Sequence, residues 1–240
     1  MGVPQRFFFV HLQKTGGTAL FQRLRDHFGP AAIYPTPDDL SGVQAVTDVA
    51  HVVEWFQARR DQLQLVTGHF PLCLPEVLGE PFTTFTVLRD PVERTLSVLR
   101  RRQVAEERFR GLALEEIYED EPLQVIIRNH MVKMLSLTPD EMTASPLLAQ
   151  VTFDDARLLA AQDNLEQRVD AFGFQEDLDE LCEQLESRFG WDLGAPRFAN
   201  RTRPGPVSDS LRARIAVDNQ MDIELYRFAR GLRDARAREA

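Results

Sequence analysis

Lysine and cysteine are both scarce in this chain of 240 residues. Only two of the 28 basic residues are lysines, Lys14 and Lys133, so arginine carries almost all of the positive charge. The two cysteines, Cys73 and Cys182, lie far apart and in no Cys-x-x-Cys spacing. This arrangement argues against a disulfide framework and against a zinc site built from cysteines, and it predicts two buried free thiols.

Long apolar runs are also missing. No run approaches the roughly 18 apolar residues of a membrane-spanning helix, so the sequence predicts no membrane span. The apolar run Phe7–Val10 is too short for a signal peptide, and polar motif residues follow it directly. We therefore expect no signal peptide and a cytoplasmic protein. The bias toward arginine is typical of a GC-rich genome and suggests a bacterial source.

Acidic residues outnumber basic ones, and the formal net charge of −9 argues against nonspecific binding of nucleic acid. The apolar fraction of 43% is ordinary for a globular protein. The length is sufficient for one α/β domain with a full core, which we expect to span residues 1–240.

Short apolar runs alternate with helical patterns along the chain, which predicts a parallel sheet with helices on both faces. Ligands of such sheets bind beyond the carboxyl ends of the strands. Lys14, His69 and Arg89 each fall just after an expected strand, so we expect them at one site. The expected strands are Phe7–Val10, 63–67, 82–88 and Ala171–Phe174; the expected helices are 48–60, 115–118, 123–135, 154–164, Leu178–Phe189 and 208–238; and the longest expected loops are 29–37, 70–81 and 190–206.

The segment after the first strand reads Lys-Thr-Gly-Gly-Thr at 14–18. Gly16 and Gly17 would form a tight turn and let backbone amides approach a ligand. Thr18 is the expected N-cap of the helix that follows. Strand, glycine turn, helix N-terminus and lysine together predict a cradle for an anion, above all a phosphate. A turn without a ligand is the alternative. The order of residues differs from that of a Walker A loop, in which the lysine follows the glycines.

A second segment begins at the end of the strand 82–88. Asp90, Pro91 and Glu93 fit the N-cap, the first and the third positions of a helix. Arg89 lies just before this cap and Ser97 lies two turns into the helix, so both side chains could reach one phosphate beside it. The alternative is a solvated network of ion pairs.

Together the two segments resemble sulfotransferases that use 3′-phosphoadenosine 5′-phosphosulfate (PAPS). Lys-Thr-Gly-Gly-Thr is similar to their 5′-phosphosulfate loop, and Leu-Arg-Asp-Pro-Val-Glu-Arg-x-x-Ser is similar to their 3′-phosphate motif. These forms are those of the branch that includes the heparan and dermatan 2-O-sulfotransferases and many bacterial enzymes. Weaker similarities follow in the same order at 128–135, 172–174, 189–191 and 200–202. Gln13 departs from the branch, which usually has proline there.

The resemblance implies a single-domain sulfotransferase fold, in which a P-loop-like parallel sheet is flanked by helices. It implies transfer of a sulfuryl group from PAPS to an acceptor hydroxyl without a metal, leaving 3′,5′-adenosine bisphosphate (PAP). Lys14 would lie on the leaving oxygen. The late loop, with Asn200, Arg201 and Arg203, would close over the nucleotide, although a solvated loop is as reasonable. The residues assigned to the nucleotide are Lys14, Thr15, Gly16, Gly17, Thr18, Arg89, Ser97 and Arg201.

The acceptor hydroxyl needs a base, and His69 is the expected one. It follows Thr67 and Gly68 at a strand end, similar to the catalytic histidine position of this branch, and an unperturbed pKa near 6.5 suits proton removal. A histidine that only bonds a backbone carbonyl is the alternative. His130 is the reserve base, and His11 is expected to brace the phosphate loop.

Two other readings remain open: a non-catalytic nucleotide-binding relative, which would lack the lysine or the base, and a P-loop kinase, which would show the Walker A order. For the acceptor we expect a hydroxyl-bearing small molecule, a lipid or a biosynthetic intermediate. The negative net charge argues against a polysaccharide polyanion. The sequence does not indicate an oligomeric state.

Overall fold

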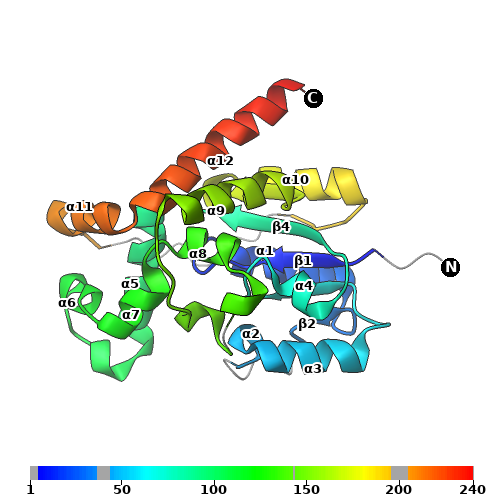
Figure 1. Cartoon of the computed structure of the whole chain (residues 1–240), viewed down its shortest axis with the longest axis horizontal. Coiled ribbons are helices and arrows are strands. Elements are labelled where there is room, and N and C mark those ends of the chain that lie inside the picture. Colours follow the sequence, from blue (N-terminus) through cyan, green and yellow to red (C-terminus); the bar gives the residue numbers. More distant parts are fainter. Residues whose placement is uncertain (1–4, 37–43, 143, 196–204, 240) are drawn as a thin grey trace.

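The chain folds around a five-stranded parallel sheet (Figure 1). The computed structural model describes residues 5–36, 44–142, 144–195 and 205–239. The strand order is β2-β3-β1-β4-β5, so β1 is central and pairs with β3 on one side and β4 on the other. The predicted α/β class and parallel sheet are confirmed. The strands are β1 (Phe7–Val10), β2 (Ile33–Tyr34), β3 (Leu65–Gly68), β4 (Thr83–Leu88) and β5 (Ala171–Phe174).

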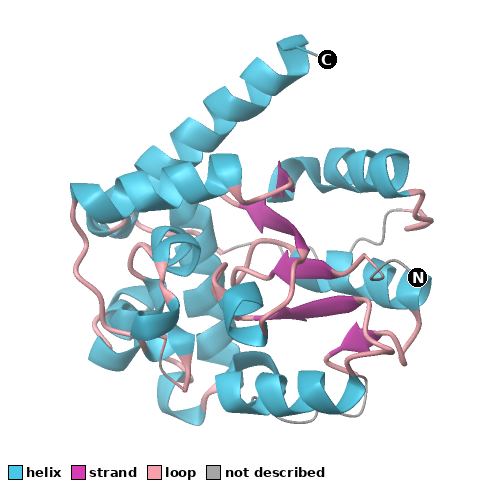
Figure 2. Cartoon of the chain, turned by 45° about the vertical axis from the view of Figure 1, so that its right-hand side comes forward, coloured by secondary structure: helices cyan, strands magenta, loops and turns pink. Residues whose placement is uncertain are grey.

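Helices cover both faces of the sheet (Figure 2). Side chains alternate between the two faces along each strand, so the apolar strands expose apolar side chains on both faces, and both must be covered. Phe7 and Phe9 of β1 pack into one apolar layer, and Phe8 and Val10 pack into the other. Burial on both faces explains why β1 reads as an unbroken apolar run. The first layer contains α1 (Gly17–Phe28) and α10 (Leu178–Phe189); the second contains α3 (Val49–Arg59), α8 (His130–Ser136), α9 (Asp155–Gln167) and α12 (Gln220–Glu239).

Several helices gather around α5 (Pro91–Ala105) beyond one end of the sheet (Figure 1). Their buried side chains form a third apolar cluster. The predicted start of α5 is confirmed, since the carboxylate of Asp90 accepts a hydrogen bond from the amide of Glu93 at 2.9 Å. The other helices of this cluster are α6 (Leu114–Tyr118), α7 (Glu121–Ile127) and α11 (Asp209–Asp218), and two shorter helices elsewhere are α2 (Gln44–Thr47) and α4 (Leu74–Leu78).

The structure corrects several local expectations. Gly16, not Thr18, is the N-cap of α1, because Gly16 supplies the left-handed residue from which the helix begins. The expected helix 123–135 is two helices, α7 and α8, separated at Asn129, whose φ of 40° breaks the helical path. Strand β2 and helix α4 lie in segments that were expected to be loops. Both are short, since β2 has two residues and α4 has five.

Two expectations from composition can be compared with the structure. Cys73 and Cys182 are buried free thiols, as predicted. None of the helices described is both long and apolar enough to cross a membrane.

Candidate functional site

The loop between β1 and α1 presents free backbone amides at the carboxyl end of the central strand. Lys14 has a positive φ of 66°, and its carbonyl accepts a hydrogen bond from Nη1 of Arg89 at 2.9 Å. The buried hydroxyl of Thr15 donates to the carbonyl of Leu12 at 2.9 Å. Within the described residues, the amides of 14–17 donate to no acceptor, and those at the start of α1 are the unsatisfied donors of a helix N-terminus. Such a cluster of amides favours binding of an anion.

The two glycines of this loop meet different steric demands. Gly16 has a φ of 88°, which L-residues with a side chain rarely adopt, and a Cβ there would lie 3.0 Å from Cγ of Gln175. A Cβ at Gly17 would overlap the imidazole of His11. That imidazole stacks on the ring of Phe9, with 5.2 Å between the ring centroids. His11 therefore lies against the loop, where it was expected to brace it.

His130 holds the same loop from the opposite side. Its Nε2 accepts a hydrogen bond from the backbone amide of Gln13 at 3.2 Å, and its Nδ1 donates to the carbonyl of Ile126 at 3.2 Å. The ring is fully buried, and burial, aided by the charge of Arg94, holds its pKa well below the usual value. Both ring nitrogens of a neutral His130 are thus engaged, which argues against a role as base. A proline at position 13 has no amide hydrogen and could not make this bond.

The position of His130 depends on the break between α7 and α8. The amide of Asn129 donates to Oδ1 of Asn219 at 3.0 Å, and the carboxylate of Asp222 accepts from the amides of Met131 and Val132 at 3.1 and 2.8 Å. These contacts cap the start of α8. The segment from α11 to α12 therefore fixes the helix that carries His130.

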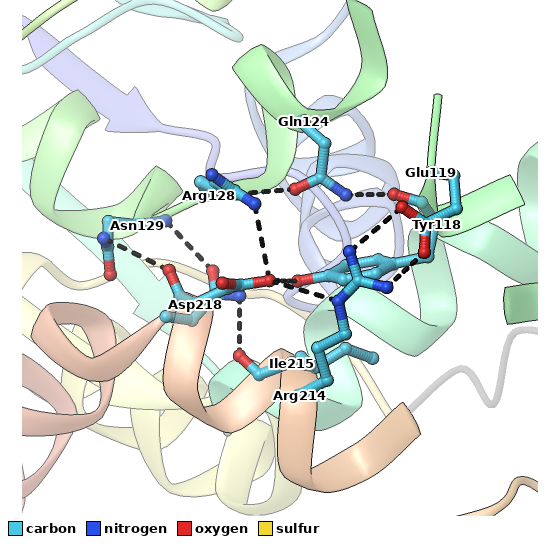
Figure 3. Close-up of polar contacts among 9 residues, drawn as sticks. Tyr118, Glu119, Gln124, Arg128, Asn129, Arg214, Ile215 and Asp218 are labelled. Atoms are coloured by element: carbon cyan, nitrogen blue, oxygen red, sulfur yellow. Dashed lines mark hydrogen bonds and ion pairs between the residues drawn. The ribbon is translucent and has the colours of Figure 1, made fainter. Parts of the chain in front are cut away.

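Figure 3 shows the surrounding contacts, in which Asp218 lies between Tyr118 and Arg128. The hydroxyl of Tyr118 donates to Asp218 at 2.8 Å, and Nη2 of Arg128 lies 3.5 Å from the same carboxylate. Burial, together with the hydrogen bond to Asp218, raises the pKa of Tyr118 and keeps the hydroxyl protonated as a donor.

His69 follows β3 on one side of the loop. Its Nδ1 donates to the backbone carbonyl of His11 at 2.8 Å, because a carbonyl can only accept. In the neutral ring Nε2 then carries no proton. Burial lowers the pKa of His69, and the nearby charge of Lys14 lowers it further, while the bond to the His11 carbonyl opposes the shift. His69 is therefore a neutral imidazole at pH 7, with Nε2 able to accept a proton.

Arg89 follows β4 on the other side of the loop. Besides the bond of Nη1 to Lys14, its buried Nε has no hydrogen-bond partner among the described residues. Burial lowers the pKa of Lys14, and the positive charges of Arg101 and Arg89 lower it further. Ser97 lies on α5, half-buried. Positive charge thus gathers beside this end of β1.

No role was expected for Arg101 from the sequence, but its positive charge lies near enough to Lys14 to lower the pKa of that ammonium group. A signal was present: Arg101 follows Ser97 by four residues, which places both on one face of α5. The contact between Gln13 and His130 was also not expected from the sequence. It joins residues 117 positions apart, and no local sequence pattern predicts it.

The structure brings Lys14, His69 and Arg89 to the carboxyl ends of three adjacent strands, as expected. Lys133, the second of the two lysines, has a structural role instead. That side chain is buried, and its Nζ donates to the carbonyls of Val125 and Leu147 at 2.7 and 2.8 Å. Arg201, with its neighbours Asn200 and Arg203, lies outside the described residues. Among the residues that are described, no three His, Cys, Asp or Glu side chains gather as metal ligands would.

No protein-family model matches the sequence, and no curated protein matches it either. Among solved structures, the fold is similar to that of a sulfotransferase from Alicyclobacillus acidocaldarius, with a TM-score of 0.52. The two chains are 16% identical, and the match covers 93% of this chain and 94% of that one. The similarity is one of fold, it extends over nearly the whole chain, and it agrees with the predicted sulfotransferase fold.

Proposed function

We propose that this protein is a PAPS-dependent sulfotransferase acting on a hydroxyl group. The proposal rests on the arrangement of polar groups at the carboxyl end of β1. The free amides of the loop and Lys14 lie in the centre. The unpaired Nε of Arg89 lies on the β4 side, and the unprotonated Nε2 of His69 lies on the β3 side. The sequences of the two motifs further support assignment of the protein to the branch that includes the 2-O-sulfotransferases and their bacterial relatives.

The residues present fit a nucleotide that carries one phosphate at the 5′ position and another at the 3′ position of its ribose. We assign the 5′-phosphate to the amides of residues 14–18, where the helix N-terminus adds a positive partial charge. Thr15 contributes its amide only, since its hydroxyl hydrogen is donated to Leu12. The exposed Thr18 also has a hydroxyl to offer. We assign the 3′-phosphate to the side chains of Arg89 and Ser97. The buried Nε of Arg89, which lacks a hydrogen-bond partner, would donate to such a phosphate.

The chemistry follows the logic of phosphoryl transfer, in which positioning and charge stabilisation do most of the work. PAPS supplies the sulfuryl group. Lys14 stabilises the negative charge that develops on the phosphate oxygen as the bond from sulfur to that oxygen breaks. His69 takes the proton of the acceptor hydroxyl while the acceptor oxygen bonds to sulfur. The products are the sulfate ester, PAP and a protonated His69, which returns its proton to solvent.

Replacement of Lys14 by alanine tests the proposal. PAP formed from PAPS in the presence of a mixture of alcohols and phenols would be measured by chromatography. We expect Lys14→Ala to lower the rate by about 10²–10³-fold, the usual cost of removing one donor to a developing oxyanion. Because an arginine is not equivalent to lysine at such a position, Lys14→Arg should restore little of the rate.

Unfolding temperatures of the two variants would serve as the control for folding. Equal rates for wild type and Lys14→Ala would remove Lys14 from the mechanism. A wild-type protein that neither consumes PAPS nor binds PAP would contradict the proposed function as a whole.

A further inference from the structure

A cavity of about 200 Å³ lies beside His69, between α1 and β3. It lies on the β3 side of β1, whereas Arg89 follows β4 on the other side. The nucleotide assigned to Arg89 and the loop therefore leaves this cavity free. His69, His11 and Thr18 are among its lining residues, so the cavity borders both the loop after β1 and the proposed base. Its volume is below the 300–1,000 Å³ that is typical of pockets for drug-sized ligands, which points to a small occupant.

Away from the histidines and threonines, the walls of the cavity combine an apolar surface with the polar side chains of Gln22 and Arg25. Phe21 of α1, Pro35 and Val46 of α2 supply the apolar part. Gln22 and Arg25 supply the polar part, and both belong to α1. Thr18, Phe21 or Gln22, and Arg25 follow one another at helical spacing on one face of α1. The seven residue steps from Thr18 to Arg25 span about 10 Å along the helix axis, at about 1.5 Å per step.

Among the described residues, the permanent charge that lines this cavity is positive. Arg25 is the one lining side chain with a permanent charge, and no carboxylate lines the cavity within the part of the chain that the structure describes. Arg25 makes no ion pair or side-chain hydrogen bond among those residues, although the protein carries 37 acidic residues. Burial keeps the pKa values of His69 and His11 low, so neither ring competes with Arg25 for an anion at pH 7.

We propose that this cavity binds the acceptor, and that the acceptor is a small hydroxy acid. The proposal rests on the proposed sulfotransferase function. The hydroxyl of the acceptor lies at Nε2 of His69, its apolar body packs on Phe21 and Val46, and its carboxylate pairs with the guanidinium of Arg25. An arginine holds a carboxylate through two parallel hydrogen bonds, which fixes the orientation of the molecule as well as its position.

A matched pair of acceptors tests this assignment. The acid 3-(4-hydroxyphenyl)propanoate and its methyl ester present the same phenol and the same apolar body, and they differ in the negative charge. We expect wild type to show a kcat/KM for the acid roughly 10- to 100-fold above that for the ester, the range for a hydrogen-bonded charge. The variant Arg25→Gln should lower kcat/KM for the acid by a similar factor and leave the ester unchanged.

Arg227→Gln, an exposed arginine on α12, is the matched control and should behave as wild type. Equal kcat/KM for acid and ester in wild type, no turnover of the acid, or equal loss for both acceptors in Arg25→Gln would overturn the hydroxy-acid assignment. PAP affinity, measured on the same samples, separates the two claims. If PAP binds normally, a failure with these acceptors concerns the cavity alone; if PAP does not bind, the proposed function fails with it.

Discussion

His69 and His130 both lie near the loop after β1, but their ring nitrogens have different partners. Both nitrogens of His130 are bonded within the protein. His69 uses only Nδ1, and that bond sets the tautomer that leaves Nε2 unprotonated. His69 is therefore the candidate base and His130 a structural residue, because only His69 keeps a ring nitrogen without a hydrogen bond. Sequence patterns do not show this difference.

The pH dependence of turnover tests the role of His69. Since the base must be unprotonated and its pKa is lowered, kcat/KM should fall as pH decreases through a midpoint below about 6.5. At high pH, activity should fall as Lys14 loses its proton, at a pH below its usual 10.5 because its pKa is also lowered. His69→Ala should lose about 10²-fold or more in rate and should lack the acidic limb.

PAP affinity should be nearly unchanged in His69→Ala, because the ring lies on the β3 side, away from Arg89. His51→Ala, which changes a half-buried histidine on α3, is the control. An acidic limb that persists in His69→Ala would assign proton transfer to another group.

The loop between β1 and α1 is held by elements that are distant in sequence. Arg89 from the end of β4 bonds the carbonyl of Lys14, and His130 from α8 bonds the amide of Gln13. Between these two anchors the loop keeps its left-handed residues and its free amides. Gln13, where the motif that this segment resembles usually has proline, supplies the amide hydrogen that His130 accepts. The departure from the motif is therefore compensated by a contact.

We expect His130→Ala to loosen the loop. The variant should unfold several degrees below wild type, because it leaves a cavity and removes two buried hydrogen bonds, each worth about 1 kcal/mol. It should also bind PAP more weakly, since the amides are less well ordered. Gln13→Pro removes the same contact from the other side, so the effects of the two changes on PAP binding should be less than additive.

Calorimetric titration with PAP of wild type, both single variants and the double variant would measure this coupling. Fully additive losses would show that His130 does not act through Gln13.

Elements with strong local signals were predictable from the sequence. The start of α5 carries its own N-cap in Asp90, and the apolar run of β1 is unmistakable. The break before α8 was not predictable, because Asn129 takes a positive φ through contacts with Asn219, 90 residues away. Thr18 was mistaken for an N-cap because a threonine after two glycines satisfies the usual rule, while the glycine geometry decides the outcome.

At the scale of the whole molecule, the sheet order explains the division of the site. β1 is central, β4 brings Arg89 to one side, and β3 brings His69 to the other. The sequence predicted that these residues meet, because parallel strands end at one edge. It did not predict which side each would occupy, since the order of strands depends on long-range packing. The acceptor cavity is hidden for the same reason, as Arg25 and Val46 meet His69 only in the folded chain.

The most direct test of the account is calorimetric titration of the wild-type protein with PAP, 5′-AMP and ATP with magnesium, repeated on Arg89→Gln. We predict that PAP binds at least about tenfold more tightly than 5′-AMP, because the 3′-phosphate gains charge-assisted hydrogen bonds from Arg89. We also predict that Arg89→Gln loses this difference and keeps its affinity for 5′-AMP. Equal affinities of the wild type for PAP and 5′-AMP, or a preference for ATP with magnesium, would contradict the account.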